Sequence, residues 1–413
     1  MNALVETRGD DQIQGAQVSE DTVSGDWHYK AEGGAHLIFG YTGSSPAYRG
    51  KVLRIRKVSA AGDDAQMAVA DEWRDRLLPK LVPSHLLVPA HAVTLSFTFV
   101  HELMLSASGV RPAWRKKDQS TAEEDVRAWL LEDLSAVDQG GNNRRTLSIE
   151  IKPKWGFLPS PAFLHPPESV PIKSRISRFV MHQHLRDATN SEGKSYDPLD
   201  LYSGDEERMQ RSLDGLFAGW KSTEGKGNNF RLSVDGVTVF PGQVRTDLHP
   251  ANLLSALSGP LILSLQSSGA LRILRDLQSS LDATDISDLA HRFHLAHPDS
   301  DLFDPSLLPD PTPEELSDFV DLYLSAPADG VTEDRWTLRQ RLIAYTMSAI
   351  FKDCSIFVTI PFTYSGNQLV STQGDSKVRL IDLDMKPISS LRKWYDLDDQ
   401  IWRHWLSTHT DGD

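Results

Sequence analysis

Cysteine is almost missing from this chain, because Cys354 is the only one in 413 residues. A single thiol cannot form an internal disulfide bond, and it cannot supply the cysteine cluster of a structural zinc site. Disulfides are rare in reducing compartments, so a chain that cannot form one fits such a compartment. We therefore expect an intracellular protein, located in the nucleus, the cytoplasm or both.

Long hydrophobic runs are missing as well. No window approaches the roughly 18 consecutive apolar residues of a membrane-spanning helix. Residues 1–26 lack the basic and apolar regions of a signal peptide, and they are acidic and poor in apolar side chains. We expect no membrane association, and we expect residues 1–26 to form a disordered acidic tail.

Positive charge is the third shortage. The 43 lysines and arginines face 57 aspartates and glutamates, which gives a formal net charge of -14. Proteins that bind nucleic acid draw most of their affinity from basic surfaces facing phosphates, so we expect no nucleic-acid partner. An anionic small molecule is not excluded, since a local cluster of cations in a cleft can reverse the field there.

Such a cluster is present around residues 147–154. Leu147, Ile149 and Ile151 alternate with polar residues, which predicts an extended strand with one face in a core. The other face would then carry Glu150, Lys152 and Lys154, with neighbours about 7 Å apart. A solvated strand face is the simpler alternative for this stretch.

A second charged strand is predicted near residues 378–386. Asp382, Asp384 and Lys386 would share one face, and paired carboxylates beside a lysine suit Mg²⁺ next to a phosphate. We expect this strand to pair with the apolar strand at residues 356–360, which follows Asp353 directly. That hairpin would bring Asp353 towards Asp382, and the combination of lysines and aspartates indicates phosphoryl transfer.

The region from Trp27 to Lys57 is predicted to be a small antiparallel sheet. It contains the pair Gly33-Gly34, followed by a strand with Arg54 and Arg56 on one face. Kinases cover nucleotide phosphates with glycine-rich strand turns, because backbone N–H groups can then approach the anion. An ordinary hairpin also carries Gly-Gly, so this alternative stays open. A helix is predicted at residues 63–80, because an apolar stripe at helical spacing runs through Met67, Val69, Trp73, Leu77 and Leu78.

Other motifs narrow the class of enzyme. The chain has no His-Arg-Asp catalytic loop and no Asp-Phe-Gly sequence, which argues against a protein kinase. His291, His294 and His297 could suggest a metal site, but their spacing is not that of a zinc motif. We prefer to interpret this segment as a polar loop and helix end.

Taken together, eight motifs in one order resemble the inositol-pentakisphosphate 2-kinase family, from the first sheet nearly to the C-terminus. They are Glu32-Gly33-Gly34-Ala35, Lys51 to Lys57, Glu150-Ile151-Lys152-Pro153-Lys154 with Gly156-Phe157-Leu158-Pro159, Arg178-Phe179 with Met181-His182-Gln183, Tyr196 to Gly204, Asn228-Asn229-Phe230-Arg231, Lys352-Asp353-Cys354-Ser355, and Asp382-Leu383-Asp384-Met385-Lys386-Pro387.

The resemblance implies an α+β fold of the two-lobed inositol-polyphosphate kinase type. A small β-rich N-lobe with one helix would span residues 27–137, and a larger mixed C-lobe would span residues 138–413. The implied activity is ATP-dependent phosphorylation of the 2-hydroxyl of inositol 1,3,4,5,6-pentakisphosphate, with Mg²⁺, to give phytic acid, by a protein acting as a monomer. A non-catalytic inositol-polyphosphate-binding scaffold on the same fold is the alternative.

Site residues follow from the resemblance by position. Asp353 would be the general base, with Lys152 between the phosphoryl group and the 2-hydroxyl. Mg²⁺ would bind Asp382, with Asp384 and Asp353 as further candidates. ATP would contact Gly33, Gly34, Ala35, His36, Arg54, Glu132, Asp133 and Glu150. Inositol phosphates would contact Arg115, Lys154, Arg186, Asn228, Asn229, Lys386, Arg392 and Tyr395.

Some of these positions depart from the family pattern. Arg186 stands where a lysine is expected, which keeps the charge and changes its shape. His36 replaces the usual asparagine after the glycine loop. The segment after Lys386 holds extra residues, so Arg392 could be displaced by one turn.

Overall fold

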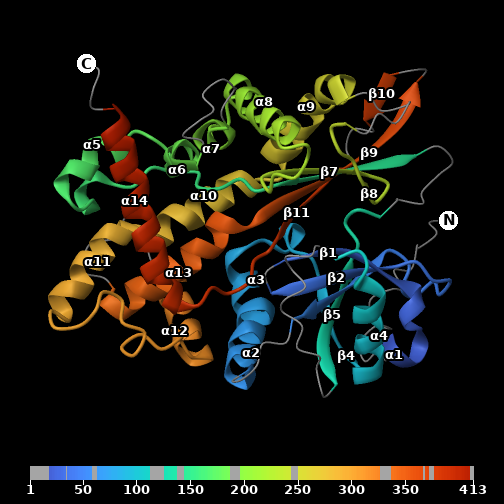
Figure 1. Ribbon diagram of the computed structural model, residues 1–413, viewed down its shortest axis with the longest axis horizontal. Coiled ribbons are helices and arrows are strands. Elements are labelled where there is room, and N and C mark those ends of the chain that lie inside the picture. The colour runs from blue at the N-terminus through green and yellow to red at the C-terminus, as the bar shows by residue number, and fades with distance from the viewer. Residues whose placement is uncertain are drawn as a thin grey trace, which may run out of the picture. The chain divides into compact units, whose positions relative to one another are not determined.

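The computed structural model describes residues 18–33, 35–57, 63–111, 125–136, 144–186, 196–242, 250–325, 336–365, 368–371 and 376–409 (Figure 1). Within these residues the fold is α+β, with two antiparallel sheets. The chain divides into two compact units, residues 1–62 with 88–137 and residues 63–87 with 138–413. This division places residues 63–87 in the second unit, whereas we expected them in the N-lobe.

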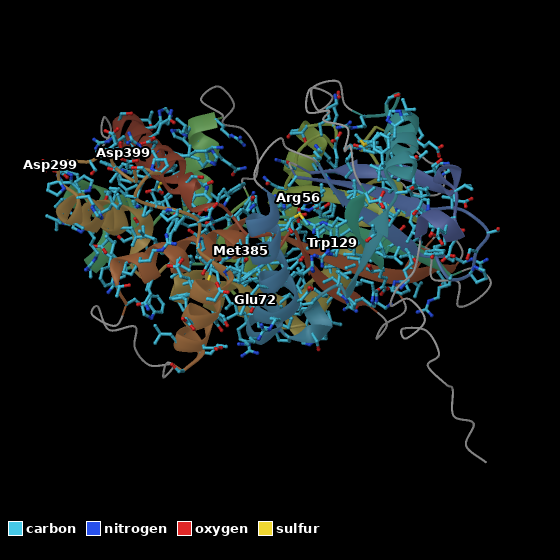
Figure 2. All side chains as sticks on the ribbon, turned by 90° about the horizontal axis from the view of Figure 1, so that it is seen from below. Arg56, Glu72, Trp129, Asp299, Met385 and Asp399 are labelled. Atoms are coloured by element: carbon cyan, nitrogen blue, oxygen red, sulfur yellow. The ribbon has the colours of Figure 1, made fainter. Side chains whose placement is uncertain are left out.

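The first unit is built on a five-stranded sheet. Its strands are β1 (Trp27–Glu32), β2 (His36–Tyr41), β3 (Lys51–Arg56), β4 (Ala90–Leu95) and β5 (Val126–Glu132), in the order β1-β2-β3-β5-β4. In β3 the buried Leu53 and Ile55 alternate with Arg54 and Arg56, as expected for a strand with one face in a core. Figure 2 labels Arg56 on β3 and Trp129 on the neighbouring β5.

Helices cover the core of this unit. Helix α4 (Phe97–Ala107) begins at Ser96, whose hydroxyl accepts a hydrogen bond from the Phe99 N–H. A short helix, α1 (Val18–Asp21), buries Val18 completely. The Asp21 carboxylate accepts a hydrogen bond from the Tyr48 hydroxyl at 2.7 Å. The segment from Val18 is therefore ordered, which the prediction of a tail over residues 1–26 did not anticipate; residues 1–17 lie outside the described residues.

The second unit contains the other sheet. Its strands run β10-β9-β6-β7-β8, and β11 also pairs with β9. The predicted hairpin is confirmed, because β11 runs antiparallel to β9 with Leu380 opposite Ile356. The central strand β6 buries Leu147, Ile149 and Ile151 completely. The strand bounds are β6 (Arg145–Ile151), β7 (Phe230–Val234), β8 (Val237–Thr238), β9 (Ser355–Ser365), β10 (Gln368–Ser371) and β11 (Lys377–Ile381).

Helices form most of the rest of the second unit. Helix α13 packs against α10 and ends at Asp353, immediately before β9 (Figure 1). No helix in the described ranges is long and apolar enough to cross a membrane. The helices are α2 (Asp63–Glu72), α3 (Leu78–Leu81), α5 (Val170–Lys173), α6 (Arg178–Arg186), α7 (Pro198–Leu201), α8 (Glu206–Ser222), α9 (Pro250–Ser267), α10 (Ala270–Leu281), α11 (Asp285–Ala296), α12 (Pro313–Leu324), α13 (Leu338–Asp353) and α14 (Leu391–His409).

A π-helical turn at Trp73–Leu77 joins α2 to α3. The Trp73 side chain is 2% exposed and belongs to the core of the second unit. Its indole N–H donates a hydrogen bond of 2.7 Å to the carbonyl oxygen of Leu383. Residues 63–87 therefore belong with the second unit because their apolar stripe is buried there.

Candidate active site

The first lysine of the site comes directly after a strand. Strand β6 ends at Ile151, and the Lys152 N–H donates to the Asn229 carbonyl oxygen at 3.0 Å. Two residues later Lys154 has a φ of 62°, in the left-handed region that non-glycine residues rarely adopt. The predicted regular alternation from Glu150 to Lys154 is therefore wrong, because the chain turns instead of extending.

Three lysine ammonium groups gather at Asp353, two of them on its carboxylate. Lys154 Nζ lies 3.6 Å from Asp353 Oδ1, and Lys386 Nζ lies 3.3 Å from Asp353 Oδ2. Lys152 Nζ lies 3.4 Å from the Asp353 carbonyl oxygen and 3.5 Å from Asp382 Oδ2. The Asp353 side chain remains 56% exposed, so a ligand can reach it. We call Lys152, Lys154, Asp353, Asp382 and Lys386 the Asp353 cluster.

The pKa values in this cluster are shifted by the same contacts. Burial opposes ionisation of Asp353, but the ammonium groups of Lys154, Lys386 and Lys152 outweigh it and lower the pKa of the carboxyl. Burial also lowers the pKa of Lys154, and the nearby Lys152 acts in the same direction, while Asp353 opposes both. The carboxylate is thus stabilised in its charged form.

Asp382 and Asp384 lie beyond the end of a strand. Strand β11 ends at Ile381, and Asp382 has a φ of 60°, so Asp382, Asp384 and Lys386 do not share one strand face as predicted. In the part of the chain that the structure describes, no group of three or more His, Cys, Asp or Glu side chains could hold a metal ion. Magnesium bound beside a nucleotide needs only one or two protein carboxylates, because phosphate oxygens and water supply the rest. Asp382 and Asp353, which both lie beside Lys152, fit that requirement.

Glu150 is held by two neighbouring strands. Its Oε1 accepts a hydrogen bond of 2.9 Å from the Ser355 hydroxyl, and its Oε2 lies 3.6 Å from Arg231 Nη1. Glu150 and Arg231 are direct partners in the β6–β7 register. Arg231 was absent from the predicted site residues, although its place after Asn228-Asn229 in a matching motif could have indicated it.

Helix α6 adds cations near Lys154. Burial lowers the pKa of His182 to about 4, and the charges of Arg178, Arg186 and Lys154 act in the same direction. These cations therefore lie close enough to His182 to influence its titration. His182 is neutral near pH 7, and the predicted substrate residues Arg186 and Lys154 lie in one electropositive region of the second unit.

Other predicted substrate residues have different surroundings. Asn229 is half-buried beside Lys152, and Asn228 is exposed next to it. Arg392 Nε pairs with Asp396 one turn along α14 at 2.9 Å. Tyr395 packs edge-on to Phe303, with ring centroids 6.3 Å apart. The structure therefore brings Lys154 and Lys386 to Asp353, whereas Arg392 pairs with Asp396 and Tyr395 packs on Phe303, away from that carboxylate. Arg115 falls outside the described residues.

The predicted nucleotide residues of the first unit surround the turn between β1 and β2. Glu32 is anchored beneath this turn, because its buried carboxylate lies 2.7 Å from Lys57 Nζ and 3.0 Å from Arg111 Nη2. Lys57 Nζ also donates to the Gly33 carbonyl oxygen at 2.9 Å. A Cβ atom added at Gly33 would meet no atom within 4 Å, so there is open space at this residue. Gly34 lies outside the described residues.

The remaining predicted nucleotide residues line the same sheet. Arg54 Nη2 lies 3.1 Å from His36 Nδ1, whose ring packs edge-on to Trp129. The Ala35 carbonyl oxygen accepts from the Lys57 N–H at 2.8 Å. At the end of β5, Glu132 is the register partner of Lys51, and Asp133 pairs with Lys30.

Comparison with known proteins identifies the family. A family model described as inositol-pentakisphosphate 2-kinase matches residues 29–400. An inositol-pentakisphosphate 2-kinase of Cryptococcus neoformans is 43% identical over 401 residues, covering 94% of this chain and 95% of the relative. The Arabidopsis thaliana protein of the same name is 28% identical over 448 residues, covering 93% of this chain and 94% of the relative. The chain therefore belongs to the inositol-pentakisphosphate 2-kinase family and is a kinase.

Proposed function

We propose that the protein transfers the γ-phosphoryl group of ATP to the 2-hydroxyl of inositol 1,3,4,5,6-pentakisphosphate, giving inositol hexakisphosphate. The observation that carries this proposal is the cluster of ammonium groups at Asp353, in which Lys154 and Lys386 pair with the exposed carboxylate and Lys152 lies against the backbone carbonyl oxygen. Cations suit a polyphosphorylated substrate, and a carboxylate among them can accept the proton of a hydroxyl. The names of the relatives agree with this substrate.

In this reaction the protein contributes mainly by positioning the substrates and neutralising their charge, and it forms no covalent bond to them. The 2-hydroxyl oxygen forms a bond to the γ-phosphorus while the bond from that phosphorus to the β–γ bridging oxygen breaks, and ADP leaves. The hydroxyl proton passes to the carboxylate of Asp353. The Lys152 ammonium group lies beside Asp353, the proposed base, and Asp382, the proposed metal ligand. It would therefore be close to the transferring phosphoryl group and would neutralise its charge.

Mg²⁺ would be held by Asp382, with Asp353 and Asp384 as further ligands. When bound there, the ion would offset the negative charge of the nucleotide phosphates. Asp382 already orients Lys152 through an ion pair of 3.5 Å. Removal of the Asp382 carboxylate would therefore affect both the metal and this lysine.

Substrate selectivity follows from the number of cations. Lys154, Lys386 and Arg186, with Asn229 and Asn228, would each bind a phosphate of the inositol ring. A ligand that lacks one phosphate leaves a cation without its partner, which disfavours lower inositol phosphates. Arg115, Arg392 and Tyr395 complete the proposed substrate set, although Arg392 would first have to leave Asp396.

Each unit, taken by itself, contains predicted ATP residues. In the first unit, the open space at Gly33 and the Arg54–His36 pair suit phosphates, and Glu132 and Asp133 suit the adenine. In the second unit, Glu150 and Arg231 lie on neighbouring strands next to the Asp353 cluster. The two-lobed kinase architecture is part of this proposal.

A non-catalytic scaffold gains no support from these observations, because the relatives carry the name of a kinase and the carboxylates of Asp353 and Asp382 serve no purpose in holding an anion. The deciding experiment incubates the protein with Mg²⁺, ATP and inositol 1,3,4,5,6-pentakisphosphate. Phosphorus and proton NMR then locate any new phosphate. Phosphate at the 2-position supports the proposal, whereas binding without turnover would replace it with the scaffold.

A further inference from the structure

A buried glutamine lies behind the Asp353 cluster. Gln278 comes from α10, whose other inward residues, such as Leu274, Leu277 and Leu281, are apolar. Its side chain is 0% exposed. A buried amide must satisfy both its donors and its acceptor within the protein, so its contacts identify what it holds.

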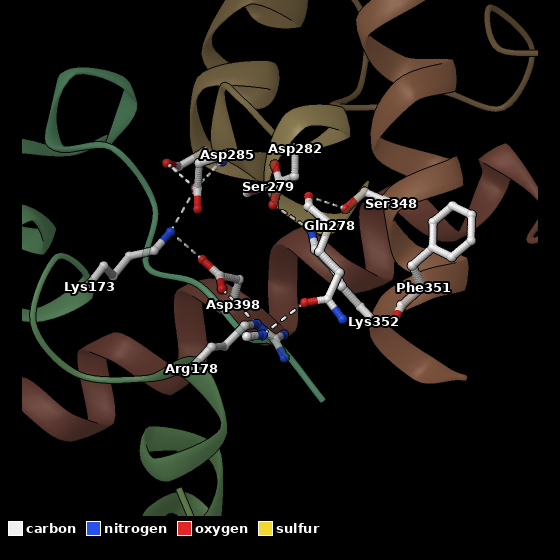
Figure 3. Close-up of polar contacts among 12 residues, drawn as sticks. Lys173, Arg178, Gln278, Ser279, Asp282, Asp285, Ser348, Phe351, Lys352 and Asp398 are labelled. Atoms are coloured by element: carbon white, nitrogen blue, oxygen red, sulfur yellow. Dashed lines mark hydrogen bonds and ion pairs between the residues drawn. The ribbon is translucent and has the colours of Figure 1, made fainter. Parts of the chain in front are cut away.

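The amide of Gln278 connects two segments that are far apart in the sequence. Its Nε2 donates to the carbonyl oxygens of Lys154 at 2.9 Å and Phe351 at 2.8 Å, and lies 3.2 Å from the Tyr202 hydroxyl. Its Oε1 accepts from the Gly156 N–H at 2.8 Å. Figure 3 shows Gln278 beside Phe351 of α13. One side chain therefore joins the loop after β6 to the last turn of α13.

Both of these segments carry a residue of the Asp353 cluster. Lys154 contributes its own carbonyl to the bridge, and its left-handed backbone is one that other contacts must stabilise. Phe351 is two residues before Asp353 on the same helix. The side chains of Lys154 and Asp353 meet 3.6 Å apart on the exposed side of this bridge.

We propose that Gln278 is a positioning residue, whose amide fixes the Lys154 ammonium group and the Asp353 carboxylate relative to one another. It acts through these two residues and does not touch the substrate. The inference rests on the proposed function, in which Asp353 accepts the hydroxyl proton and Lys154 binds a phosphate.

The neighbourhood of Gln278 makes this bridge rigid. Asp282, four residues further along the chain, accepts a hydrogen bond from Lys352, the residue before Asp353 (Figure 3). Lys352 Nζ also lies 3.9 Å from the centre of the Trp155 ring, in the loop that follows Lys154. A second connection thus runs parallel to the Gln278 amide, so loss of the amide should shift the two segments without separating them.

The test replaces Gln278 with methionine, which has a similar length and no polar atoms for the two carbonyls. We expect kcat to fall about 10- to 100-fold, because displacement of reacting groups by about 1 Å can cost a factor of this size. The KM for ATP should change by less than about twofold. If Gln278→Met fails to fold, Gln278→Asn, which keeps an amide but is one methylene group too short to hold both carbonyl oxygens, should lower kcat in the same way.

A matched control separates positioning from a general loss of stability. Thr346 is buried in α13, and its hydroxyl donates to the Leu342 carbonyl oxygen within that helix. Thr346→Val removes a buried hydrogen bond but leaves the bridge intact, so kcat should stay within about twofold. In the background of Lys154→Met, the Gln278→Met change should cost much less than in the wild type, because the two residues act together.

A second measurement does not depend on turnover. In Gln278→Met the Gly156 N–H loses its acceptor and the Lys154 and Phe351 carbonyl oxygens lose their donor, so the backbone amide NMR signals of residues 154–156 and 351–353 should shift, whereas Thr346→Val should leave them in place. Wild-type turnover on pentakisphosphate with full kcat in Gln278→Met would overturn the positioning role alone. Absence of turnover in the wild type would overturn the proposed function, and unshifted amide signals at residues 154–156 and 351–353 in Gln278→Met would overturn the positioning role.

Discussion

Asp353 is the residue on which the proposed chemistry depends most directly. Its carboxylate is charged at neutral pH, because the surrounding ammonium groups lower its pKa. It also repels anionic ligands that the same lysines attract. Removal of this one charge should therefore have opposite effects on turnover and on binding.

We predict that Asp353→Ala reduces turnover by at least about 100-fold, the range for loss of a general base, while pentakisphosphate binding is retained or becomes tighter. Calorimetry measures the binding and a phosphate-transfer assay measures the turnover. The isosteric Asp353→Asn is the control for shape and should lose turnover equally. Retained turnover in both variants would remove Asp353 from the role of base.

The titration of His182 is sensitive to the cations around it. Its pKa of about 4 reflects burial and then the charges of Arg178, Arg186 and Lys154. A polyanion bound to these cations offsets their field, so the pKa of His182 should rise from about 4, while burial, the larger cause, keeps it below its usual value of 6.5. Between the pKa of the free protein and that of the complex, the complex holds more protons.

Histidine NMR titration with and without inositol hexakisphosphate tests this, with the signal assigned by comparison with His182→Gln. Because ligand binding raises the pKa of His182, a proton on this side chain strengthens the binding of inositol hexakisphosphate. This contribution to the affinity should therefore grow as the pH falls towards about 4. His182→Gln should lack this part of the pH dependence, whereas protonation of the ligand itself affects both proteins. An unchanged His182 pKa on ligand binding would contradict the placement of the substrate near α6.

At the scale of elements, the loop after β6 depends on close packing at Gly156. A Cβ atom at this position would lie 2.5 Å from the ring of Tyr202, closer than atoms can approach. Tyr202 is buried, and its hydroxyl donates to the Lys154 carbonyl oxygen at 3.2 Å. The ring therefore cannot move without disturbing the loop that carries Lys154.

Gly156→Ala should destabilise the protein by about 1–3 kcal/mol, the usual range for overpacking, and should lower kcat as well. Gly219→Ala is the matched control, because Gly219 lies in α8 with open space around it. Alanine should stabilise that helix by about 0.5–1 kcal/mol. Equal unfolding free energies for the two variants in urea would refute the packing argument.

Helix α14 is fixed to the rest of the second unit by buried charges. Asp398 lies 2.7 Å from Lys173 Nζ and 2.9 Å from Arg178 Nε, and Lys173 also pairs with Asp285 (Figure 3). Burial opposes ionisation of Asp398, but Lys173 and Arg178 lower its pKa overall. Removing one member of such a group leaves a buried charge without its partner.

Asp398→Ala should therefore cost about 3–5 kcal/mol of unfolding free energy at neutral pH. Asp399→Ala, one residue along the same helix, breaks an exposed pair with Arg403 and should cost only about 0.3–0.5 kcal/mol. Because the folded-state pKa of Asp398 is lowered, its contribution is present above the unfolded value of 3.8 and is lost as the pH falls through the folded value. A difference between the variants that persists in strong acid would contradict this account.

At the scale of the whole molecule, the proposed ligands divide between the two units. The inositol-phosphate residues that the structure describes, such as Lys154, Arg186 and Lys386, all belong to the second unit, and the Gly33 turn belongs to the first. We predict that pentakisphosphate alone slows hydrogen exchange around residues 152–156 and 178–186. A non-hydrolysable ATP analogue should slow exchange around residues 32–36. Protection by pentakisphosphate confined to the first unit would contradict the assignment.

Much of this layout could be predicted from local sequence, and some could not. The motifs around Lys152, Asp353 and Asp382 were found, and the pairing of β9 with β11 was correct, because alternating apolar residues predict strands reliably. The left-handed backbone at Lys154 and Asp382 was missed, since nothing in a non-glycine residue indicates a positive φ. These two residues mark where tertiary contacts override the local preference for an extended chain.

Gln278 and Arg231 were missed for a different reason. A glutamine on the apolar face of a helix belongs to no motif, and its partners lie 73 and 124 residues away in the sequence. The apolar stripe after Asp63 was recognised, but its pattern does not say which of two cores buries it. Contacts between distant segments decide both the partners of Gln278 and the core that buries the helix after Asp63. Such contacts cannot be read from the local pattern of a single sequence.

The bond between Trp73 and Leu383 has a consequence for how the protein is made. The two residues are separated by 310 positions, and Trp73 belongs to the core of the second unit. At translation rates of about 5–20 residues per second, roughly 15–60 seconds pass before Leu383 is synthesised. During that interval the apolar side chains of this segment, such as Trp73, Leu77 and Leu81, have no completed core to pack into, so the nascent chain leaves them exposed until its last strands are made.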